Sequence, residues 1–292
     1  MSILANKNTR VLVQGITGIQ ASFHVKRSMD NGTNVVAGTS PHFTQSEHLG
    51  VPVFHTAAEA VKNMPIDASM LFVPAKAVKQ AVREAVEAKI KLLVSIAQGV
   101  PVHDMLEIKS MLKGSETIMI GPNTPGLITP NEARLGIFPE NIMRPGNIGI
   151  ISRASTLTYE GILETNAAGL GQSTVIGLGD DMVIGTDFCE PLRLFMEDEK
   201  TKAVLLIGKA DNAYEQIAAE YYRQLKHKKP VVAFVAGEAL PFASTMGYAA
   251  DILTHGLTTA QDKKKLMNDA GMIVVERMSA IHQALAELNL HD

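Results

Sequence analysis

The feature that most constrains this chain is an alternation of short aliphatic runs with amphipathic helical stretches. In the first half the expected strands are "RVLVQG", "TNVVAG", "VPVF", "ASMLFVP", "KLLVSIA" and "TIMIGP". Helices are expected from about Thr17, over "AKAVKQAVREAVEAKI" and over "VHDMLEIKSML". Because buried parallel strands are rich in aliphatic residues and are joined by helices, this alternation predicts an α/β fold with a parallel sheet covered on both faces.

A stretch rich in proline and glycine, residues 122–146, interrupts this alternation. It contains five prolines, Pro122, Pro125, Pro130, Pro139 and Pro145. The alternation then restarts with "NIGIIS", "STVIGLG", "KAVLLIG", "PVVAFVAG" and "MIVVER", and a terminal helix is expected from Ser279. We predict a domain over residues 1–121, an ordered connector over 122–146 and a second domain over 147–292, a division that suits a chain of 292 residues.

Composition and charge argue against several classes of function. A formal charge of -3 gives no electrostatic reason to expect nucleic acid or an anionic membrane as partner. The longest apolar runs are much shorter than the roughly 20 residues that a membrane helix needs. The N-terminus enters a strand at once, without the organisation of a signal peptide. The single cysteine, Cys189, excludes an internal disulfide and is expected to be a small buried hydrophobe, so we expect a cytoplasmic protein.

The first strand and helix are joined by a glycine-rich turn, "VLVQGITGIQAS", in which Gly15, Gly18 and Ala21 are spaced as G-x-x-G-x-x-A. Such a turn brings backbone N–H groups and a helix N-terminus close to a phosphate, although tight packing alone also selects glycine. NAD would require an acidic residue near the end of the second strand. That strand continues as "VVAGTSPHF" without one, which argues against a nicotinamide-dependent oxidoreductase.

The motifs "QGITGIQASFH", "HLGVPVF", "VPA" at 73–75, "IGPNTPGLITP" and "ISRASTLTYE" follow one another in an order and spacing that resemble the α subunit of succinyl-CoA synthetase, from end to end. The resemblance implies an N-terminal Rossmann-like domain that holds coenzyme A or an acyl-CoA, and a C-terminal flavodoxin-like domain. In that family a histidine of the second domain passes a phosphoryl group between nucleotide and succinate. A separate ATP-grasp β subunit, the implied partner, binds the nucleotide.

The resemblance also implies where coenzyme A is held. Its contacts fall by position at Thr17, Gly18, Ile19, Gln20, Val73, Pro74, Ala75, Ile96, Ala97 and Gln98. The alternative for 73–75 and 96–98 is a set of strand ends without a ligand, but the carboxyl ends of parallel strands favour ligand contact. Phe43 stands where the family has a lysine, and this change predicts weaker affinity or a ligand with a different tail.

The position of the family's phosphohistidine is occupied by Tyr248, in "GYAA". A phenol of pKa about 10 is mostly protonated near neutral pH, and its phosphate ester transfers poorly. Other positions depart from the family pattern around the same site: Lys209 for the orienting glutamate, Asp180 for a loop glycine, Ala154 and Ser155 at a helix start, and Thr254, His255 and Leu257 after the tyrosine. These changes together predict that the phosphoryl relay is lost.

The remaining polar residues of the C-terminal half are expected to have structural roles. Lys209 is predicted to pair with Asp180 or Asp181 and so fill the former anion site, whereas Asp211 and Glu215 are expected to be solvated. His255 is expected to be an ordinary loop histidine, and the hydroxyls of Ser152, Ser155 and Thr156 are expected to cap a helix. We find no histidine with metal-ligand spacing to a cysteine or carboxylate and predict no metal.

Two functions from different classes remain open. One is a catalytically degenerate α-subunit homologue that keeps the coenzyme A domain and acts as a binding, regulatory or partner subunit. The other is an active acyl-CoA ligase or acyltransferase subunit of altered mechanism, working with an ATP-grasp β-like partner. The sequence leaves a homo- or hetero-oligomer equally open.

Overall fold

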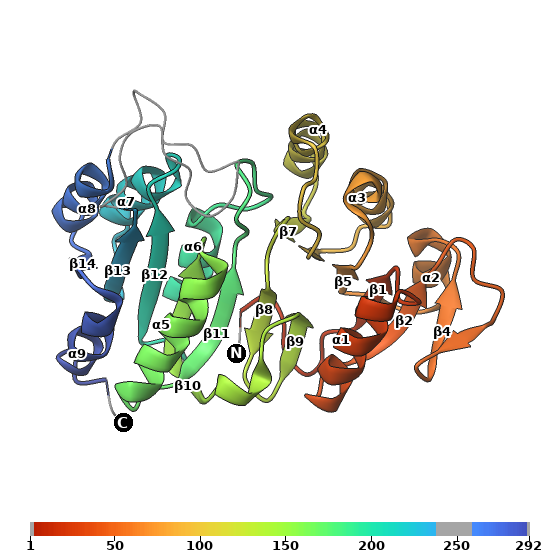
Figure 1. Cartoon of the computed structure of the whole chain (residues 1–292), viewed down its shortest axis with the longest axis horizontal. Helices are drawn as coiled ribbons and strands as arrows, with labels where there is room; N and C mark the ends of the chain where they lie inside the picture. Colours follow the sequence, from red (N-terminus) through yellow and green to blue (C-terminus); the bar gives the residue numbers. More distant parts are fainter. Residues whose placement is uncertain (1–2, 238–258, 291–292) are drawn as a thin grey trace. The chain divides into compact units, whose positions relative to one another are not determined.

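The computed structural model describes residues 3–237 and 259–290, which form two compact units (Figure 1). The N-terminal unit comprises Leu4–Glu140 and Val183–Thr186, and the C-terminal unit consists mainly of Asn141–Met182 and Asp187–Asp292. The stretch predicted as a connector holds the antiparallel hairpin of β8 (Gly126–Thr129) and β9 (Ala133–Gly136), both fully buried. The N-terminal unit therefore continues beyond residue 121, through most of the proline-rich stretch.

The N-terminal unit is built on a sheet of seven strands: β1 (Val11–Gln14), β2 (Val35–Thr39), β3 (Glu47–His48), β4 (Val51–Phe54), β5 (Ala68–Leu71), β6 (Leu92–Ser95) and β7 (Ile118–Ile120). Their order is β3-β4-β2-β1-β5-β6-β7, and only the β3–β4 pair is antiparallel. The chain leaves β1 toward β2 and later returns on the other side as β5. The carboxyl end of β1 is therefore a switch point, the place where open α/β sheets bind ligands.

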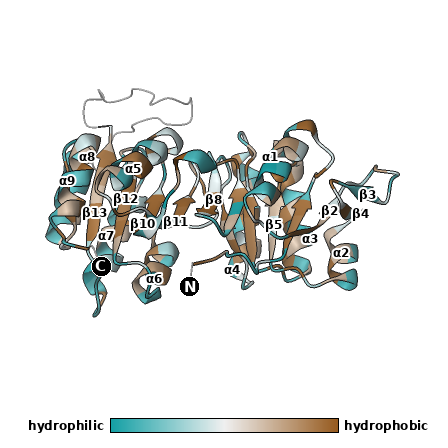
Figure 2. Ribbon diagram, turned by 90° about the horizontal axis from the view of Figure 1, so that it is seen from below, coloured by the Kyte–Doolittle hydropathy of each residue, from teal (hydrophilic) through white to brown (hydrophobic). Residues whose placement is uncertain are grey.

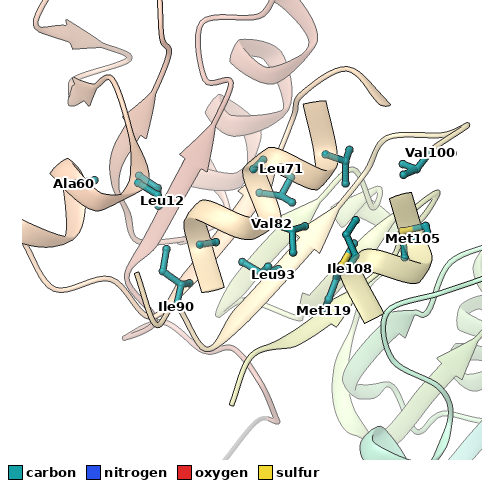
Figure 3. Packing of buried hydrophobic residues seen from close by; sticks show 14 of the residues in the cluster. Leu12, Ala60, Leu71, Val82, Ile90, Leu93, Val100, Met105, Ile108 and Met119 are labelled. Carbon is teal, nitrogen blue, oxygen red and sulfur yellow. The ribbon is translucent and has the colours of Figure 1, made fainter. Parts of the chain in front are cut away.

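Helices cover this sheet: α1 (Ile19–Asp30), α2 (Ala57–Asn63), α3 (Val78–Glu87) and α4 (Val102–Lys113), with the 3-10 turn η1 (Ala75–Ala77) before α3. The apolar faces of α2, α3 and α4 share one core cluster with the sheet, in which Leu71, Val82, Leu93, Ile108 and Met119 are all buried (Figure 3). Burying one such side chain contributes about 1.5–3 kcal/mol. This core holds the carboxyl ends of β5 and β6 at one edge of the sheet.

The C-terminal unit has the strands β10 (Pro145–Ser152), β11 (Gln172–Gly177), β12 (Ala203–Lys209), β13 (Val231–Ala236) and β14 (Ile273–Val274). Its helices are α5 (Ser155–Ala167), α6 (Cys189–Glu197), α7 (Tyr214–Gln224), α8 (Ala260–Asp269) and α9 (Ile281–Ala286), with the 3-10 turns η2 (Glu140–Ile142) and η3 (Met278–Ala280). The strands run β14-β13-β12-β10-β11, all in parallel, which is the flavodoxin order. Its switch point is the carboxyl end of β10.

Hydropathy follows these layers. The central strands are largely apolar, whereas hydrophilic residues occur on helices such as α8 (Figure 2). The predicted fold class, a Rossmann-like domain followed by a flavodoxin-like domain, is confirmed. Within the described residues, none of the helices has the length and apolarity to cross a bilayer.

Candidate functional site

The glycine-rich turn after β1 has the geometry of a phosphate cradle. Gly15 has a φ of +81°, and a Cβ at this position would lie 2.4 Å from the Phe72 carbonyl oxygen, so only glycine fits. Gly18 is the N-cap of α1, and no side chain caps this helix start. The turn therefore presents the N-terminus of α1 without an obstructing side chain, an arrangement suited to an anionic group.

The ten residues predicted to contact coenzyme A lie after three strands of one sheet. Residues 17–20 follow β1, residues 73–75 follow β5, and residues 96–98 follow β6. Because β1, β5 and β6 are neighbours in the parallel sheet, these segments share its carboxyl edge. The side chain of Ile19 is 87% exposed there, and Gly18, Gln20, Pro74 and Gln98 are exposed as well.

Phe43 belongs to a segment between β2 and β3 that is hydrogen-bonded to the glycine-rich turn and to the start of α1. The hydroxyls of Thr17 and Ser40 share a hydrogen bond of 3.0 Å, and Ser22 Oγ lies 2.8 Å from His48 Nε2. The half-buried ring of Phe43 packs edge-to-face against the His48 ring, with their centroids 5.8 Å apart. Thr17, Phe43 and their partners thus form one connected group beside the cradle.

A buried arginine that the sequence analysis did not single out fixes α1 behind the turn. Arg134, on β9, is 1% exposed and donates hydrogen bonds to the carbonyls of Phe138 (2.6 Å) and His24 (2.9 Å) and to Ser28 Oγ (3.0 Å). Burial, followed by the positive charges of Arg134 and Arg27, lowers the pKa of His24. The hairpin thereby anchors the helix whose first residues form the cradle.

In the C-terminal unit a buried charge cluster lies at the carboxyl ends of β10 and β12. Lys209, the last residue of β12, is 2% exposed, and its Nζ lies 2.5 Å from Asp180 Oδ1 and 3.6 Å from Asp211 Oδ2. Arg153, which follows β10, contacts Asp211 Oδ1 at 2.7 Å through Nη1. The predicted pairing of Lys209 with Asp180 is confirmed.

The expectation that Asp211 and Glu215 are solvated is wrong. Glu215 is fully buried and pairs with the equally buried Lys263 of α8, with Nζ and Oε2 2.7 Å apart. Its other oxygen accepts a hydrogen bond of 2.9 Å from the backbone N–H of Lys209. The carboxylate reaches this position because residue 208 is a glycine. A Cβ added at residue 208 would lie 2.4 Å from Glu215 Cγ.

The sequence contained a signal for these buried charges. The buried residues of α7 are Glu215, Ala218, Ala219 and Tyr222, and those of α8 are Ala260, Lys263, Lys264 and Met267. Both sets follow the i, i+3, i+4, i+7 spacing of a core-facing stripe. A charged residue at such a position is placed in the interior and needs a partner there.

Within residues 3–237 and 259–290, the ion pairs of this cluster join three cations (Arg153, Lys209 and Lys263) with three carboxylates (Asp180, Asp211 and Glu215). Burial alone would raise the pKa of Asp211, but the charges of Arg153, Lys209 and Lys263 hold it below its usual value. The ammonium of Lys209 is thus neutralised by carboxylates of the chain itself. An additional anion at this position would have to displace Asp180 or meet its negative charge.

Several predicted site residues lie outside the described residues: Tyr248, Thr254, His255 and Leu257. At the helix start of "SRAST", Ser155 and Thr156 are the first residues of α5, and no side chain caps the helix from its N-cap, Ala154. The predicted capping by these hydroxyls is wrong. Ser152 Oγ instead accepts a hydrogen bond of 3.1 Å from the N–H of Ala154.

The statement that no histidine has metal-ligand spacing to a carboxylate is also wrong. On α4 the possible ligand atoms of His103, Asp104 and Glu107 lie within 4.8 Å of one another. The ammonium of Lys79 lies 2.6 Å from Asp104 Oδ1 and 3.1 Å from Glu107 Oε1, so these carboxylates already have a cation. Cys189 is only partly buried, and this burial, with Asp187 nearby, raises the pKa of its thiol to about 12.

Comparison with known proteins gives matches along most of the chain. Residues 6–120 match a CoA binding domain, and residues 151–273 match a CoA-ligase domain. The succinate–CoA ligase [ADP-forming] subunit alpha 2 of Archaeoglobus fulgidus is 45% identical over 99% of this chain and 100% of that protein. The corresponding alpha subunit of Aquifex aeolicus is 43% identical, over 99% of this chain and 95% of its own length.

Solved structures share the fold. ATP citrate lyase of Methanothrix soehngenii, in complex with citrate and coenzyme A, covers 98% of this chain with a TM-score of 0.88 and 21% identity. A dinucleotide-forming acetyl-coenzyme A synthetase of Ca. Korarchaeum cryptofilum covers 94%, with a TM-score of 0.76 and 16% identity. This chain spans 50% and 59% of the lengths of those two chains.

Proposed function

Since this chain belongs to the succinate–CoA ligase alpha-subunit family, we propose that it is a coenzyme-A-binding subunit that has lost the phosphoryl relay. It would act as a binding or regulatory partner, in the cytoplasm, of an ATP-grasp β-like subunit. Two parts of this proposal rest on different units of the chain and are tested separately: the binding of coenzyme A, and the absence of a phosphorylated intermediate.

Coenzyme A binding is supported by the cradle of the CoA binding domain. Gly15 allows close backbone approach, and the uncapped start of α1 offers N–H groups to the phosphates. Residues 73–75 and 96–98, at the same edge, would line the rest of the ligand. When bound, coenzyme A supplies the thiol that accepts the acyl group in acyl-CoA chemistry.

Calorimetric titration of the full chain with coenzyme A tests this part. A matched variant is Gly15→Ala, which leaves the charge unchanged but whose Cβ would lie 2.4 Å from the Phe72 carbonyl oxygen and so displace the turn. Saturable heat for the wild type, weakened in the variant, supports the proposal. Absence of heat at millimolar coenzyme A would show that the turn no longer binds this ligand.

Loss of the relay rests on one observation above all, the buried pair of Lys209 and Asp180 at 2.5 Å. By the resemblance, the family has a glutamate that orients the histidine at the position of Lys209, and a glycine of the phosphate loop at the position of Asp180. Here a carboxylate occupies the loop, and a cation occupies the position of the orienting acid. Tyr248, at the histidine position, is a poor phosphoryl carrier.

A reconstitution experiment tests the loss. The wild type and the variant Tyr248→His with Lys209→Glu are each combined with a β subunit, ATP, magnesium, succinate and coenzyme A. We expect no succinyl-CoA from either, because Asp180 and the changes at the start of α5 remain. Turnover by the wild type overturns the proposal, and turnover by the variant alone confines the defect to the two substituted positions.

A second function is favoured by the relatives: chains 40–45% identical along almost the whole length are named as ligase subunits. In this alternative the chain is an active acyl-CoA ligase or acyltransferase subunit that uses an acyl phosphate made elsewhere. Coenzyme A and a synthetic acyl phosphate would then yield an acyl-CoA without ATP. No acyl-CoA in that assay favours the degenerate subunit.

A further inference from the structure

The geometry points to Phe43 as a stacking platform for the adenine ring of coenzyme A. This inference rests on the proposed coenzyme A binding and adds how the adenosine end is recognised. It starts from the segment of residues 40–48, which two side-chain hydrogen bonds join to the phosphate cradle. One bond links Thr17 to Ser40, and the other links Ser22 to His48.

The second bond continues into the turn itself. The Ser22 hydroxyl donates to the Ile16 carbonyl at 3.2 Å, so its oxygen can accept from His48 Nε2 at 2.8 Å. The His48 ring is thereby fixed against the first turn of α1. Phe43 packs edge-to-face on this ring, with an interplanar angle of 80°.

A backbone hydrogen bond also fixes Phe43. The Phe43 N–H donates to the Ser40 carbonyl at 3.3 Å, and the Ser40 hydroxyl is hydrogen-bonded to the Thr17 hydroxyl. A half-buried aromatic ring is therefore tied at both ends of its segment to the cradle. An ordered ring of this kind loses little conformational freedom when a planar ligand stacks on it.

Charge recognition is the competing way to hold the adenosine end, since coenzyme A carries a phosphate on its ribose. Between Arg27 and Lys62 the chain contains no lysine or arginine, so this segment offers no permanent cation. Adenine, by contrast, stacks readily on an aromatic face. The available chemistry at Phe43 therefore recognises a planar base and is indifferent to the ribose phosphate.

Three ligands distinguish these modes when titrated into the full chain. Coenzyme A has all groups, dephospho-coenzyme A lacks the ribose phosphate, and 4′-phosphopantetheine lacks the whole adenosine part. The wild type should bind the first two with similar affinity. Phe43→Ala should weaken both by roughly 5- to 150-fold, the range of aromatic–base stacking, and leave 4′-phosphopantetheine unchanged.

Two further variants sharpen the result. Phe43→Trp keeps a stacking face and should bind coenzyme A at least as well as the wild type, whereas Phe43→Leu keeps apolar bulk and should behave like Phe43→Ala. Phe43→Lys should create a preference for coenzyme A over dephospho-coenzyme A that salt suppresses. Far-UV circular dichroism confirms that each variant is folded.

Three outcomes overturn the inference. The first is equal weakening of all three ligands by Phe43→Ala, which indicates a general effect on the cradle. The second is no weakening of any, and the third is a strong preference of the wild type for coenzyme A over dephospho-coenzyme A. If the wild type binds none of the three at millimolar concentration, the proposed coenzyme A function fails with it, a result distinct from the other three.

Discussion

Removing the ammonium of Lys209 tests whether the charge cluster of the C-terminal unit is a closed structural unit. Lys209→Met keeps the length of the side chain but removes the ammonium that lies 2.5 Å from Asp180 and 3.6 Å from Asp211. Both members of the Lys209–Asp180 pair are at least nine-tenths buried, so water cannot replace the lost contact. The variant therefore carries an uncompensated negative charge in its interior.

The expected loss is about 3–5 kcal/mol in the free energy of unfolding, the usual cost of breaking a buried pair. At about 2–4 °C per kcal/mol for a unit of this size, the melting temperature falls by roughly 6–20 °C. Asp180→Leu alone should also destabilise the fold, because it removes the carboxylate that lies 2.5 Å from the buried Lys209 ammonium. The double variant should recover most of the loss, because apolar residues can replace a buried pair at little net cost.

Tyrosine fluorescence is a suitable probe for this cycle. The chain has no tryptophan, and its five tyrosines, Tyr159, Tyr214, Tyr221, Tyr222 and Tyr248, all fall in the C-terminal unit. Emission during urea unfolding therefore reports on the unit that holds the cluster. Single variants within about 1 kcal/mol of the wild type, or a double variant with strictly additive losses, would refute the reasoning.

Three further predictions concern other parts of the chain. Gly15→Ala should destabilise the N-terminal unit by about 1–3 kcal/mol, seen by far-UV circular dichroism, because its Cβ meets the Phe72 carbonyl at a positive φ. Asp211→Asn should lower the free energy of unfolding most near neutral pH. The pKa of the wild-type Asp211 carboxyl is depressed, mainly by Arg153, so this carboxylate stabilises the fold above about pH 4 and loses the effect in acid. The difference in unfolding free energy from the wild type should therefore shrink between pH 7 and pH 3, and a constant difference would contradict this. Cys189, whose thiol pKa is raised to about 12, should react with iodoacetamide at pH 8 far more slowly than in the urea-unfolded chain.

Most of the fold could be predicted because long aliphatic runs determine its buried strands. β12 and β13 are such runs and were expected at these positions. β3 was not, because Glu47 and His48 have no apolar pattern and form a strand only by pairing with β4. The hairpin of β8 and β9 was not predicted, because the five prolines of the surrounding residues 122–146 indicate a connector more strongly than the short aliphatic run of β8 indicates a strand.

The candidate site was predictable where the family resemblance assigned positions and not where it depends on helix packing. The pairing of Lys209 with Asp180 was expected because the resemblance assigns both residues to one former anion site. The structure brings them together from strands on either side of β10. Glu215 and Lys263 are far apart in sequence, and their contact exists only because α7 and α8 pack together. Their helical spacing indicated that each faces inward, but could not identify the partner of each charge.

The central claim, a subunit that keeps coenzyme A binding without a phosphoryl relay, is tested most directly by phosphate on the chain itself. The full chain is incubated with ATP, magnesium and an ATP-grasp β subunit, and its intact mass is measured at neutral pH, with the Aquifex aeolicus alpha subunit treated in parallel. We predict no phosphate adduct on this chain. A stoichiometric, acid-labile adduct, at His255 or any other histidine, would contradict the account.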